Sequence, residues 1–393
     1  MLKAGVVSLD TEKKWIGGRY YLQHLVKCNS LLLASEQVEL RDVWWVKKPE
    51  EDPFSEVRAY LGESITVRPS SGIVKRLSGK IRRVFGVSKG SSDLFREAGL
   101  DVFFPIPPCE NSGMPYVFWL PDFQYLRRPD LMSETLRSDL EKYFHEHVHA
   151  ANRIVLSSDD ARNDFAKVFP QFIDRTHVVK FCSVPDDDWY SLVPEVVAEK
   201  YKLPRRFFIV CNQFTRHKNH LTLVDAMKML SEQGILDVHL VCTGSTFDHR
   251  QEDYVGEVTR VLEDSGLTGN VHILGLIPRA DQIALLRRSI AVLQPSWFEG
   301  WSTIIEDAKT LGKPVLASDL PVHREQLGAE HAYLLGLDDS AAWADAMAQL
   351  WRKLEAGPDL VAEAEARIKL QVSQRECGLA FTSALKAAVP DLR

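Results

Sequence analysis

Short runs of β-branched and aromatic residues alternate along the chain with longer segments in which apolar residues recur every three or four positions. The apolar runs predict strands at residues 3–9, 38–46, 102–106, 116–120, 153–158, 177–181, 206–212, 238–244, 271–275, 290–296, 314–318 and 332–336. The amphipathic segments predict helices, most clearly at 19–32, 220–234 and 279–289. Strands and helices that alternate on this scale predict parallel sheets covered by helices on both faces.

A change of composition near the middle of the chain predicts a domain boundary. Residues 185–206 contain three consecutive aspartates and several prolines, and a new apolar strand follows them. A chain of 393 residues is also longer than one ordinary core requires. We therefore predict an N-terminal domain at 1–190, a C-terminal domain at 200–370, and a final helix at 371–393 placed to pack back on the first domain. In such sheets, ligands bind beyond the carboxyl ends of the strands.

The overall composition favours a globular protein of the cytoplasm. Hydrophobic residues make up 45% of the chain and charged residues 26%, and no run approaches 18 apolar residues. A net charge of −6 argues against nucleic acid as a partner. The N-terminus lacks the apolar core of a signal peptide, and the six cysteines show no CxxC spacing, as expected of reduced core thiols.

The loop after the strand at 206–212 has the sequence NQFTRHKNH. A helix is predicted to begin near Asn219, so Arg216 and Lys218 lie in a strand-to-helix loop. In such a loop, a cation and the helix N-terminus together attract an anion such as a diphosphate. A solvated loop without a ligand is the alternative.

Three carboxylates, Glu299, Glu306 and Asp307, lie close together in the segment SWFEGWSTIIEDAKTLGKP. Thr303 and Glu306 have the spacing of a capping box, in which the glutamate only starts a helix. Glu299 precedes the helix, and Gly300 lets backbone amides approach a ligand closely. The spacing therefore predicts a structural role for Glu306 and leaves the other two acids for chemistry.

This segment resembles the donor-site signature of retaining glycosyltransferases of family 4, which have the GT-B fold. The resemblance lies in the order of its features along the chain. A predicted strand is followed by PS, an aromatic residue, EG, a second carboxylate eight residues after the glutamate of EG, and GKPVLAS. The upstream HILGLIPRADQIALLRRS, the loop NQFTRHKNH and the N-terminal IGGRYYLQHL are similar to the same family, and LPDFQYLRRPD and RIVLSSDDARNDF to a bacterial polysaccharide branch of it. The resemblance implies an α/β fold of two Rossmann-like domains whose parallel sheets face an interdomain cleft.

Carried over position by position, the resemblance implies a nucleotide-sugar donor site. In it, Glu299 faces the hydroxyls of the transferred sugar, and Asp307, rather than Glu306, holds the ribose, since one carboxylate can accept from two vicinal hydroxyls. Lys218 neutralises the departing diphosphate. The other implied donor residues are Gly17 and Gly18 in a turn after the first strand, Gln213 where the family often has arginine, Arg216, Leu276 and Ile277 in the base-binding loop, and the backbone of Gly300, Trp301, Ser302 and Thr303.

On the acceptor side, the resemblance points to the residues that follow the strand at 116–120. Many members of the family have His-Asp where this chain has Pro121 and Asp122, so the family's histidine is absent. Asp122 and Gln124 are predicted to face the cleft, and Asp122 joins Glu299 and Lys218 as a catalytic candidate. An Asx turn that only orders the loop is the alternative for Asp122.

Two further motifs have competing interpretations. His145-Glu146-x-x-His149 matches a zinc-protease motif, but a strand follows soon after it, no third ligand is well spaced, and the family resemblance implies a metal-independent reaction. We therefore predict no metal. Residues 64–92 contain seven basic and no acidic side chains. They predict either a basic amphipathic helix on an anionic membrane or an ordinary helix with a solvated basic face.

Taken together, the resemblance implies a retaining hexosyltransferase. Its donor would be a nucleotide diphosphate sugar, with GDP-mannose favoured over UDP-sugars and no further cofactor. Its acceptor would be a lipid-linked or growing polysaccharide, reached in the cytoplasm or at the inner face of the cytoplasmic membrane. A sugar-nucleotide epimerase of the same fold and a non-catalytic two-lobed sugar-binding protein are the alternatives.

Overall fold

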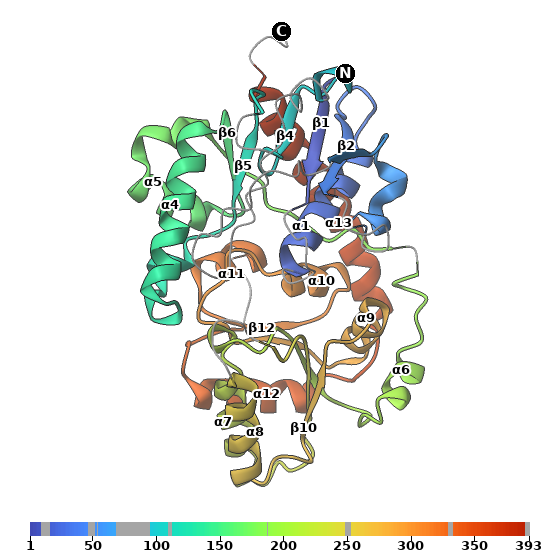
Figure 1. The fold of residues 1–393 in the computed structure, drawn as a ribbon. Coiled ribbons are helices and arrows are strands. Elements are labelled where there is room, and N and C mark those ends of the chain that lie inside the picture. The colour runs from blue at the N-terminus through green and yellow to red at the C-terminus, as the bar shows by residue number, and fades with distance from the viewer. Residues whose placement is uncertain are drawn as a thin grey trace. The chain divides into compact units, whose positions relative to one another are not determined.

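The computed structural model describes residues 1–8, 16–45, 52, 54–67, 95–108, 112–186, 188–247, 253–328 and 333–389. The chain divides into two compact units (Figure 1). The first comprises Met1–Asp122, Leu140–Val184 and Val372–Arg393, and the second comprises Phe123–Asp139 and Pro185–Gln371. We expected the first domain to run without interruption to residue 190, whereas residues 123–139 cluster with the second unit.

The first unit is built on parallel strands in the orders β3-β2-β1-β4 and β5-β6-β7. A parallel bridge between Phe103 and Tyr116 connects β4 to β5. Its elements are β1 (Lys3–Val7), α1 (Ile16–Ser30), β2 (Glu39–Trp45), η2 (Ser55–Tyr60), β3 (Ile65–Val67), β4 (Val102–Phe104), β5 (Val117–Leu120), α4 (Glu134–Ala150), β6 (Arg153–Leu156), α5 (Asp159–Val168), η4 (Pro170–Arg175) and β7 (Thr176–Val178).

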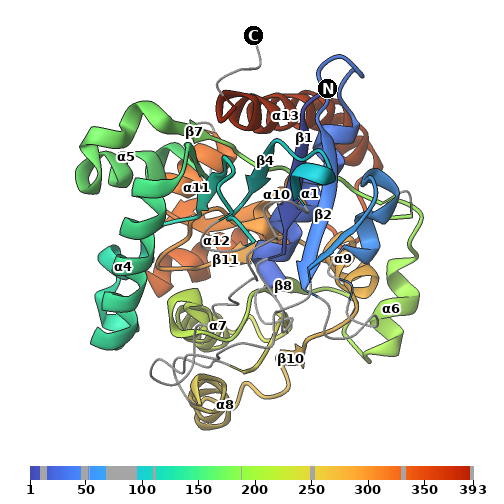
Figure 2. The same ribbon diagram turned by 45° about the horizontal axis from the view of Figure 1, so that its top comes forward.

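Helices cover the strands of this unit because the strands are apolar on both faces. Every residue of β4 and of β5 is buried, as expected for parallel strands that lie between layers. Helix α5 packs on β6 and β7 (Figure 2). It begins where the sequence provides a cap, since the Ser158 hydroxyl accepts a hydrogen bond from the Ala161 N–H at 3.0 Å.

The glycine pair at Gly17 and Gly18 lies in the first turn of α1. The prediction of a turn before the helix is therefore wrong. Glycine weakens a helix by about 1 kcal/mol per residue, but Tyr21, Leu22 and Leu25 on the same helix are buried. Burial of each such side chain contributes about 1.5–3 kcal/mol, so packing outweighs the low helix propensity of the two glycines.

The second unit contains one six-stranded parallel sheet in the order β10-β9-β8-β11-β12-β13. Counted along the chain within the unit, this order is 3-2-1-4-5-6, that of dinucleotide-binding Rossmann sheets. Its elements are α3 (Gln124–Arg127), η3 (Pro129–Leu131), α6 (Pro194–Lys200), β8 (Phe208–Cys211), η5 (Arg216–Lys218), α7 (His220–Glu232), β9 (Leu240–Thr243), α8 (Tyr254–Asp264), β10 (Val271–Gly275), α9 (Arg279–Arg288), β11 (Val292–Gln294), α10 (Thr303–Thr310), β12 (Val315–Ser318), α11 (Pro321–Leu327), β13 (Leu334–Leu335) and α12 (Ser340–Lys353).

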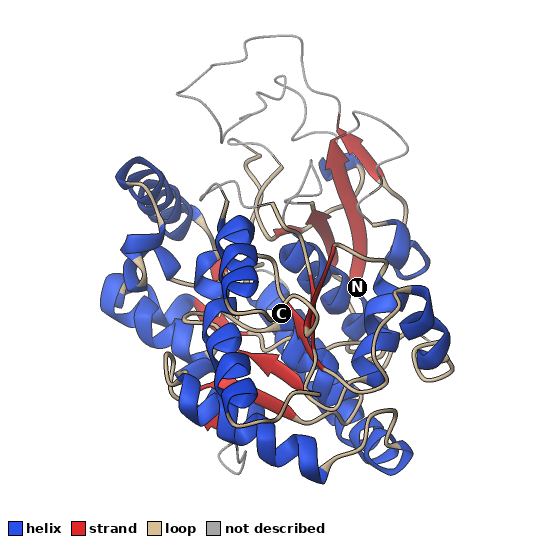
Figure 3. Cartoon of the chain, turned by 90° about the horizontal axis from the view of Figure 1, so that it is seen from below, coloured by secondary structure: helices blue, strands red, loops and turns tan. Residues whose placement is uncertain are grey.

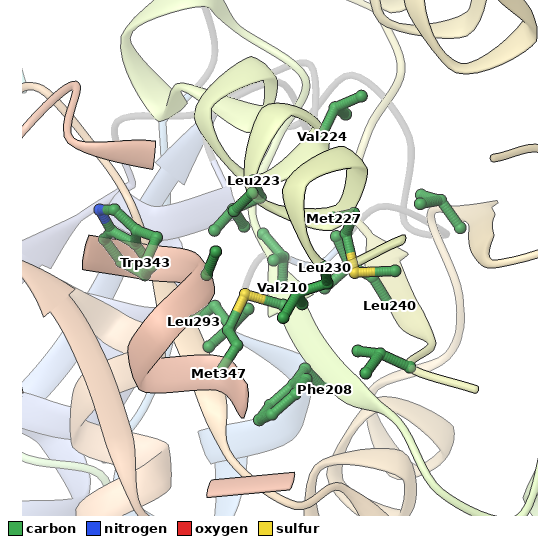
Figure 4. Packing of buried hydrophobic residues seen from close by; sticks show 14 of the residues in the cluster. Phe208, Val210, Leu223, Val224, Met227, Leu230, Leu240, Leu293, Trp343 and Met347 are labelled. Carbon is green, nitrogen blue, oxygen red and sulfur yellow. The ribbon is translucent and has the colours of Figure 1, made fainter. Parts of the chain in front are cut away.

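Side chains of the six-stranded sheet alternate between two apolar cores. Phe208 and Val210 of β8 pack in a cluster with α7, α8 and α12, to which Met227 and Met347 contribute (Figure 4). Ile209, between them in sequence, packs in a second cluster with residues of α9 and α10. Helices cover both faces of these strands, which explains the near-continuous apolar runs in the sequence. Figure 3 shows the helices of the chain in blue and its strands in red.

Helix α13 (Leu360–Ala387) contributes to both units. In the second unit, Glu363 forms a buried ion pair with Arg287, whose Nε lies 2.7 Å from Glu363 Oε1. In the first unit, the Phe381 ring meets Phe104 edge-on at 5.0 Å between centroids. The helix therefore ends in a different core from the one in which it begins.

Membrane association was predicted from the basic residues of the segment 64–92. The structure describes only residues 64–67 of this segment, of which Ile65–Val67 form β3. The basic residues themselves lie outside the described residues. Among the described residues, no helix combines the length and apolar character needed to cross a membrane.

Truncation of Glu363 to Ala is expected to destabilise the second unit strongly. It would leave the Arg287 guanidinium, 3% exposed, without its counter-charge. Breaking a buried pair in this way costs about 3–5 kcal/mol. Urea unfolding followed by far-UV circular dichroism measures the change.

The matched control is Glu195→Ala, which removes a carboxylate that is 51% exposed and pairs with Arg288. Exposed pairs contribute about 1 kcal/mol or less. Equal effects of the two substitutions would contradict the structural importance assigned to the Arg287–Glu363 pair.

Candidate functional site

Polar side chains of the second unit gather beyond the carboxyl ends of β8 and β11, the two neighbouring strands at which the strand order reverses. Ligands bind at such a reversal in doubly wound sheets. Asn212 follows β8 and Gln294 ends β11. The Asn212 side-chain amide donates to Gln294 Oε1 at 2.9 Å, so a buried hydrogen bond connects the two strand ends.

A salt bridge connects the loops that follow these strands. The Trp297 N–H donates to the His217 carbonyl at 2.8 Å, which holds the loop after β11 against η5. Lys218 Nζ lies 2.6 Å from Glu299 Oε1, and the two side chains are 18% and 8% exposed. The structure thus brings together two residues that were predicted separately from the sequence.

Gln294 orients the Glu299 carboxylate. Its Nε2 donates to Glu299 Oε1 at 2.6 Å and to Ser296 Oγ at 3.2 Å, and the side chain is fully buried. Because Gln294 Oε1 already accepts from Asn212, the amide can present only its NH₂ group to the glutamate. Neither Asn212 nor Gln294 was predicted from the sequence. The available signal was a polar residue at the end of each buried strand.

The environment keeps Glu299 ionised at neutral pH. Burial raises the pKa of its carboxyl, but the electrostatic interactions with Lys218 and His323 and the hydrogen bonds from Lys218 and Ser296 lower it more, so the pKa lies below its ordinary value. His323 is itself buried on α11, and burial lowers the pKa of its imidazole despite the charge of Glu299. A neutral His323 donates through Nδ1 to the Ser318 carbonyl, 2.8 Å away.

The second predicted acid, Asp307, is paired with a cation that the sequence pattern did not indicate. Arg279 Nη2 lies 2.7 Å from Asp307 Oδ1, and the aspartate side chain is 1% exposed. The Arg279 guanidinium in turn lies over the Trp189 ring, 5.0 Å from its centroid. Asp307 is therefore held by an ion pair in the middle of α10.

The third acid, Glu306, does not form the predicted capping box. The N-cap of α10 is Ser302, without a side-chain cap. Instead, Gln326 of α11 accepts from the Ser302 N–H and donates to the Ser302 carbonyl, both at 3.0 Å. Gln326 Nε2 and Lys309 Nζ also lie 3.0 Å from Glu306 Oε1. The capping-box prediction is wrong because another helix supplies these bonds. Glu306 instead accepts a hydrogen bond from the Gln326 side chain, which helps to hold Gln326 against Ser302.

Two of the predicted donor residues are engaged elsewhere. Both terminal nitrogens of Arg216 bind Glu257 of α8, and its guanidinium lies 5.3 Å from the centroid of the Tyr254 ring. Gln213 Nε2 donates to the Phe247 carbonyl at 2.9 Å. The structure thus gives Lys218, rather than Arg216, as the cation beside Glu299.

The other predicted donor residues of the second unit occupy the loops after β10 and β11. Leu276 follows β10 with 67% of its side chain exposed, while Ile277 packs against the core that contains α9 and α10. Gly300 and Trp301 lie between Glu299 and α10, which begins at Thr303. Their roles toward a donor stay predictions.

The candidates on the acceptor side are placed by the strands that precede them. Asp122 follows β5 and clusters with the first unit, as do Gly17 and Gly18, and Gln124 begins α3 in the second unit. Their roles also stay predictions. On α4, His149 Nδ1 lies 2.8 Å from the His145 carbonyl. Neither histidine belongs to a group of potential metal ligands in the part of the chain that the structure describes.

A family model matches most of the second unit. Residues 197–367 match the family model Glycosyl transferases group 1. The chain is 26% identical to D-rhamnosyltransferase WbpZ of Pseudomonas aeruginosa over 228 residues, 56% of each protein. It is 25% identical to O-antigen chain mannosyltransferase B of Escherichia coli over 194 residues, 48% of this chain and 49% of the relative. The chain therefore spans about half the length of these relatives.

Comparison with solved structures extends over nearly the whole chain. Anabaena Alr3699/HepE in complex with UDP and glucose matches with a TM-score of 0.67 at 15% identity, covering 99% of this chain and 98% of that one. WaaG, a glycosyltransferase involved in lipopolysaccharide biosynthesis, matches with a TM-score of 0.58 at 13% identity, covering 99% and 100%. With the parallel sheets of the two units, these similarities confirm the GT-B fold class predicted from the sequence.

Replacement of Lys218 by Met is expected to destabilise the second unit in a pH-dependent way. In the wild type, the pKa of Glu299 in the folded state lies below its ordinary value of 4.5. Ionised Glu299 therefore stabilises the folded state above that pH, and this contribution to the free energy of unfolding is lost as the pH falls through the folded-state pKa. Without Lys218, burial dominates and raises this pKa. We expect a loss of up to about 3 kcal/mol at pH 7 and a smaller loss at pH 4, where the carboxyl of the variant is protonated.

Urea unfolding at both pH values measures this difference. Lys167→Met is the control, because Lys167 is 74% exposed in its pair with Asp164 and its loss should cost about 1 kcal/mol or less. A Lys218→Met loss that is equal at pH 7 and pH 4 would contradict the proposed charge compensation.

Proposed function

We propose, from the membership of residues 197–367 in the Glycosyl transferases group 1 family, that this chain transfers a hexose from a nucleotide diphosphate sugar to a polysaccharide acceptor. The observation that carries the proposal is the Lys218–Glu299 salt bridge of 2.6 Å beyond the ends of β8 and β11. It places a cation suited to a diphosphate within one hydrogen-bond length of a carboxylate suited to sugar hydroxyls. The strand order makes this the expected ligand position.

In this proposal Lys218 acts on the leaving group. As the bond between the sugar and the diphosphate breaks, negative charge develops on the phosphate oxygens. A cation fixed in a poorly hydrated site stabilises that charge without having to reorient. Since η5 and the loop after β11 hold Lys218 in place, its contribution is available before the reaction begins.

Glu299 would orient the transferred sugar. An ionised carboxylate accepts hydrogen bonds from two neighbouring hydroxyls, and Glu299 has a lowered pKa. Gln294 fixes the position of Oε1 at 2.6 Å. A sugar that is already held in the reactive orientation loses less rotational entropy on the way to the transition state, so the reaction is faster.

Asp307 would bind the ribose of the donor. Its carboxylate is shorter by one methylene than the glutamate usual in the family, and Arg279 holds it at 2.7 Å. The fixed orientation favours a contact with the two ribose hydroxyls. Leu276, exposed after β10, would lie against the base.

We further propose retention of configuration without a metal. The acceptor would attack on the face from which the diphosphate departs, and the leaving phosphate would take the acceptor proton. Lys218 would then supply the charge stabilisation that this step requires. Gly17, Gly18, Asp122 and Gln124 stay the candidates for contacts with the donor phosphates and the acceptor.

The acceptor is proposed to be a lipid-linked or growing surface polysaccharide. Support comes from the functions of similar proteins, an O-antigen chain mannosyltransferase and a glycosyltransferase involved in lipopolysaccharide biosynthesis. Such an acceptor would place the enzyme in the cytoplasm, peripherally on the inner face of the membrane. The mannosyltransferase supports GDP-mannose as donor, whereas the complex of HepE with UDP and glucose supports a UDP-sugar.

Substitution Glu299→Gln is expected to lower transfer by at least about 100-fold, the magnitude typical of losing one preorganised polar contact to the transition state. The isosteric change keeps the side-chain volume and removes the charge. Release of nucleoside diphosphate with a glycan acceptor measures the rate.

Glu306→Gln is the matched control, because Glu306 contacts Gln326 and Lys309, and the substitution should leave transfer within about threefold of wild type. Equal losses in the two variants would contradict the site assignment. Turnover of the nucleotide sugar without any acceptor would favour the epimerase instead.

Nucleotide binding should distinguish the two donor classes. A nucleotide present at about one hundred times its Kd stabilises a protein by about 2.7 kcal/mol, so the matching diphosphate raises the melting temperature. We expect a larger shift with GDP than with UDP, and a reduced shift for either in Asp307→Asn. A larger shift with UDP would reverse the donor assignment, and no shift with any nucleotide would contradict a donor site.

A further inference from the structure

Three buried cysteines of the first unit meet at one point although they are far apart in the sequence. Cys28 lies in the last turn of α1, Cys182 follows β7, and Cys377 lies on α13. Their Sγ atoms all lie within 4.8 Å of one another, and the Cys28–Cys182 distance is 3.9 Å. The side chains are 0%, 2% and 2% exposed. Since the whole chain has only six cysteines, this gathering calls for a chemical explanation.

We propose that Cys28, Cys182 and Cys377 bind a thiophilic d10 metal ion through three thiolates, with Cu(I) as the ion that fits the ligand set best. Thiolate sulfur selects soft ions such as Cu(I) and Zn(II) over oxygen-preferring cations. Three sulfurs at about 2.3 Å from a central ion lie about 4.0 Å apart. The observed 3.9 Å between two of them therefore requires little movement.

The elements that carry the cysteines are fixed to one another around this point. His24, one helical turn before Cys28, accepts the Val184 N–H through Nδ1 at 3.0 Å, which ties α1 to the loop that carries Cys182. Gln374, on the turn of α13 before Cys377, donates to the Ser183 carbonyl at 3.4 Å. The sulfurs are thus held by rigid helices and a tethered loop, as a preorganised site requires.

The backbones of α1 and α13 also approach each other closely beside two of the cysteines. Gly378 follows Cys377, and a Cβ added to it would lie only 2.7 Å from the Cys28 carbonyl oxygen. Any other residue at this position would push α13 away from α1. The glycine therefore permits the short distance between the cysteines of the two helices.

The surroundings of the site favour a dry, low-coordinate ion. Tyr21 stacks on Trp119 at 3.9 Å between centroids and meets Phe181, the residue before Cys182, edge-on. Within the described residues, no fourth His, Cys, Asp or Glu joins the group. Structural zinc almost always takes four ligands, whereas a soft monovalent ion can be satisfied by three thiolates.

Binding at this site must displace protons. The form of cysteine that binds a metal is the thiolate, not the thiol. Each thiol that becomes a ligand therefore releases one proton to water as its bond to the metal forms. Metal affinity should accordingly increase with pH.

The test is a competition between the reduced full-length protein and a chromogenic Cu(I) chelator under anaerobic conditions. We expect the wild type to retain one equivalent of Cu(I). Single substitutions of Cys28, Cys182 or Cys377 by Ser should each weaken retention by more than about 100-fold, beyond the 10- to 100-fold cost of losing a supporting residue. Zn(II) titrated in the same way should bind more weakly.

Cys242→Ser is the matched control, because Cys242 is also buried but lies on β9 of the second unit. It should leave Cu(I) retention within about threefold of wild type. Failure of the wild type to retain Cu(I) against the chelator would overturn the proposal, as would folded trio variants that retain it as well as the wild type.

A second readout separates loss of the site from loss of the fold. The Cys→Ala variants of the trio are compared with the Ser variants by circular dichroism, and thermal unfolding is followed with and without one equivalent of Cu(I). The wild type should melt at a higher temperature with Cu(I), and folded variants should show no increase. An equal increase in wild type and variants would place the ion elsewhere and overturn the proposal.

Discussion

A buried carboxylate sets the geometry of the second unit. Glu299 is 9% exposed, and a charge removed from water destabilises a fold unless it is paired and hydrogen-bonded. Lys218 Nζ and Gln294 Nε2 each lie 2.6 Å from its Oε1. Lys218 lies in the loop after β8, and Gln294 is the last residue of β11. The contacts that compensate the charge of Glu299 therefore hold the loops after these two strands in fixed positions relative to each other.

The compensation depends in turn on the sheet. Strands β8 and β11 are neighbours in space although other elements separate them along the chain. Their contact puts Asn212 beside Gln294, and the hydrogen bond between them determines which end of the Gln294 amide faces Glu299. Apolar cores on both faces hold the strands in place. A substitution that creates a cavity in either core would therefore shift the side chains of the site, because close-packed protein interiors transmit strain.

The two adjacent acids of α10, Glu306 and Asp307, have different partners. Asp307 is oriented by Arg279, and Glu306 by Lys309 and Gln326, so adjacent carboxylates lie in separate networks. Gln326 performs for Ser302 the backbone bonding that a capping residue usually performs. The helix start is thus stabilised by tertiary contacts, which leaves Glu299 outside the capping arrangement.

Much of the fold could be predicted because parallel strands buried on both faces must be apolar throughout. Each strand expected from an apolar run corresponds to a strand in the structure. The strand β3 (Ile65–Val67) was not predicted. The glycine turn and the capping box failed for a common reason, since local propensities of about 1 kcal/mol are smaller than the packing and hydrogen bonding that oppose them.

The sequence by itself determined the alternation of strands and helices and the positions of Lys218 and Glu299 just after strands, because burial and turn chemistry act over a few residues. Only the tertiary structure decided their partners. Asn212 and Gln294 are 82 positions apart, and Cys28 and Cys182 are 154 apart. Such contacts depend on which strands and helices become neighbours in space. The packing of the whole unit decides this, so a pattern over a few residues of sequence cannot predict it.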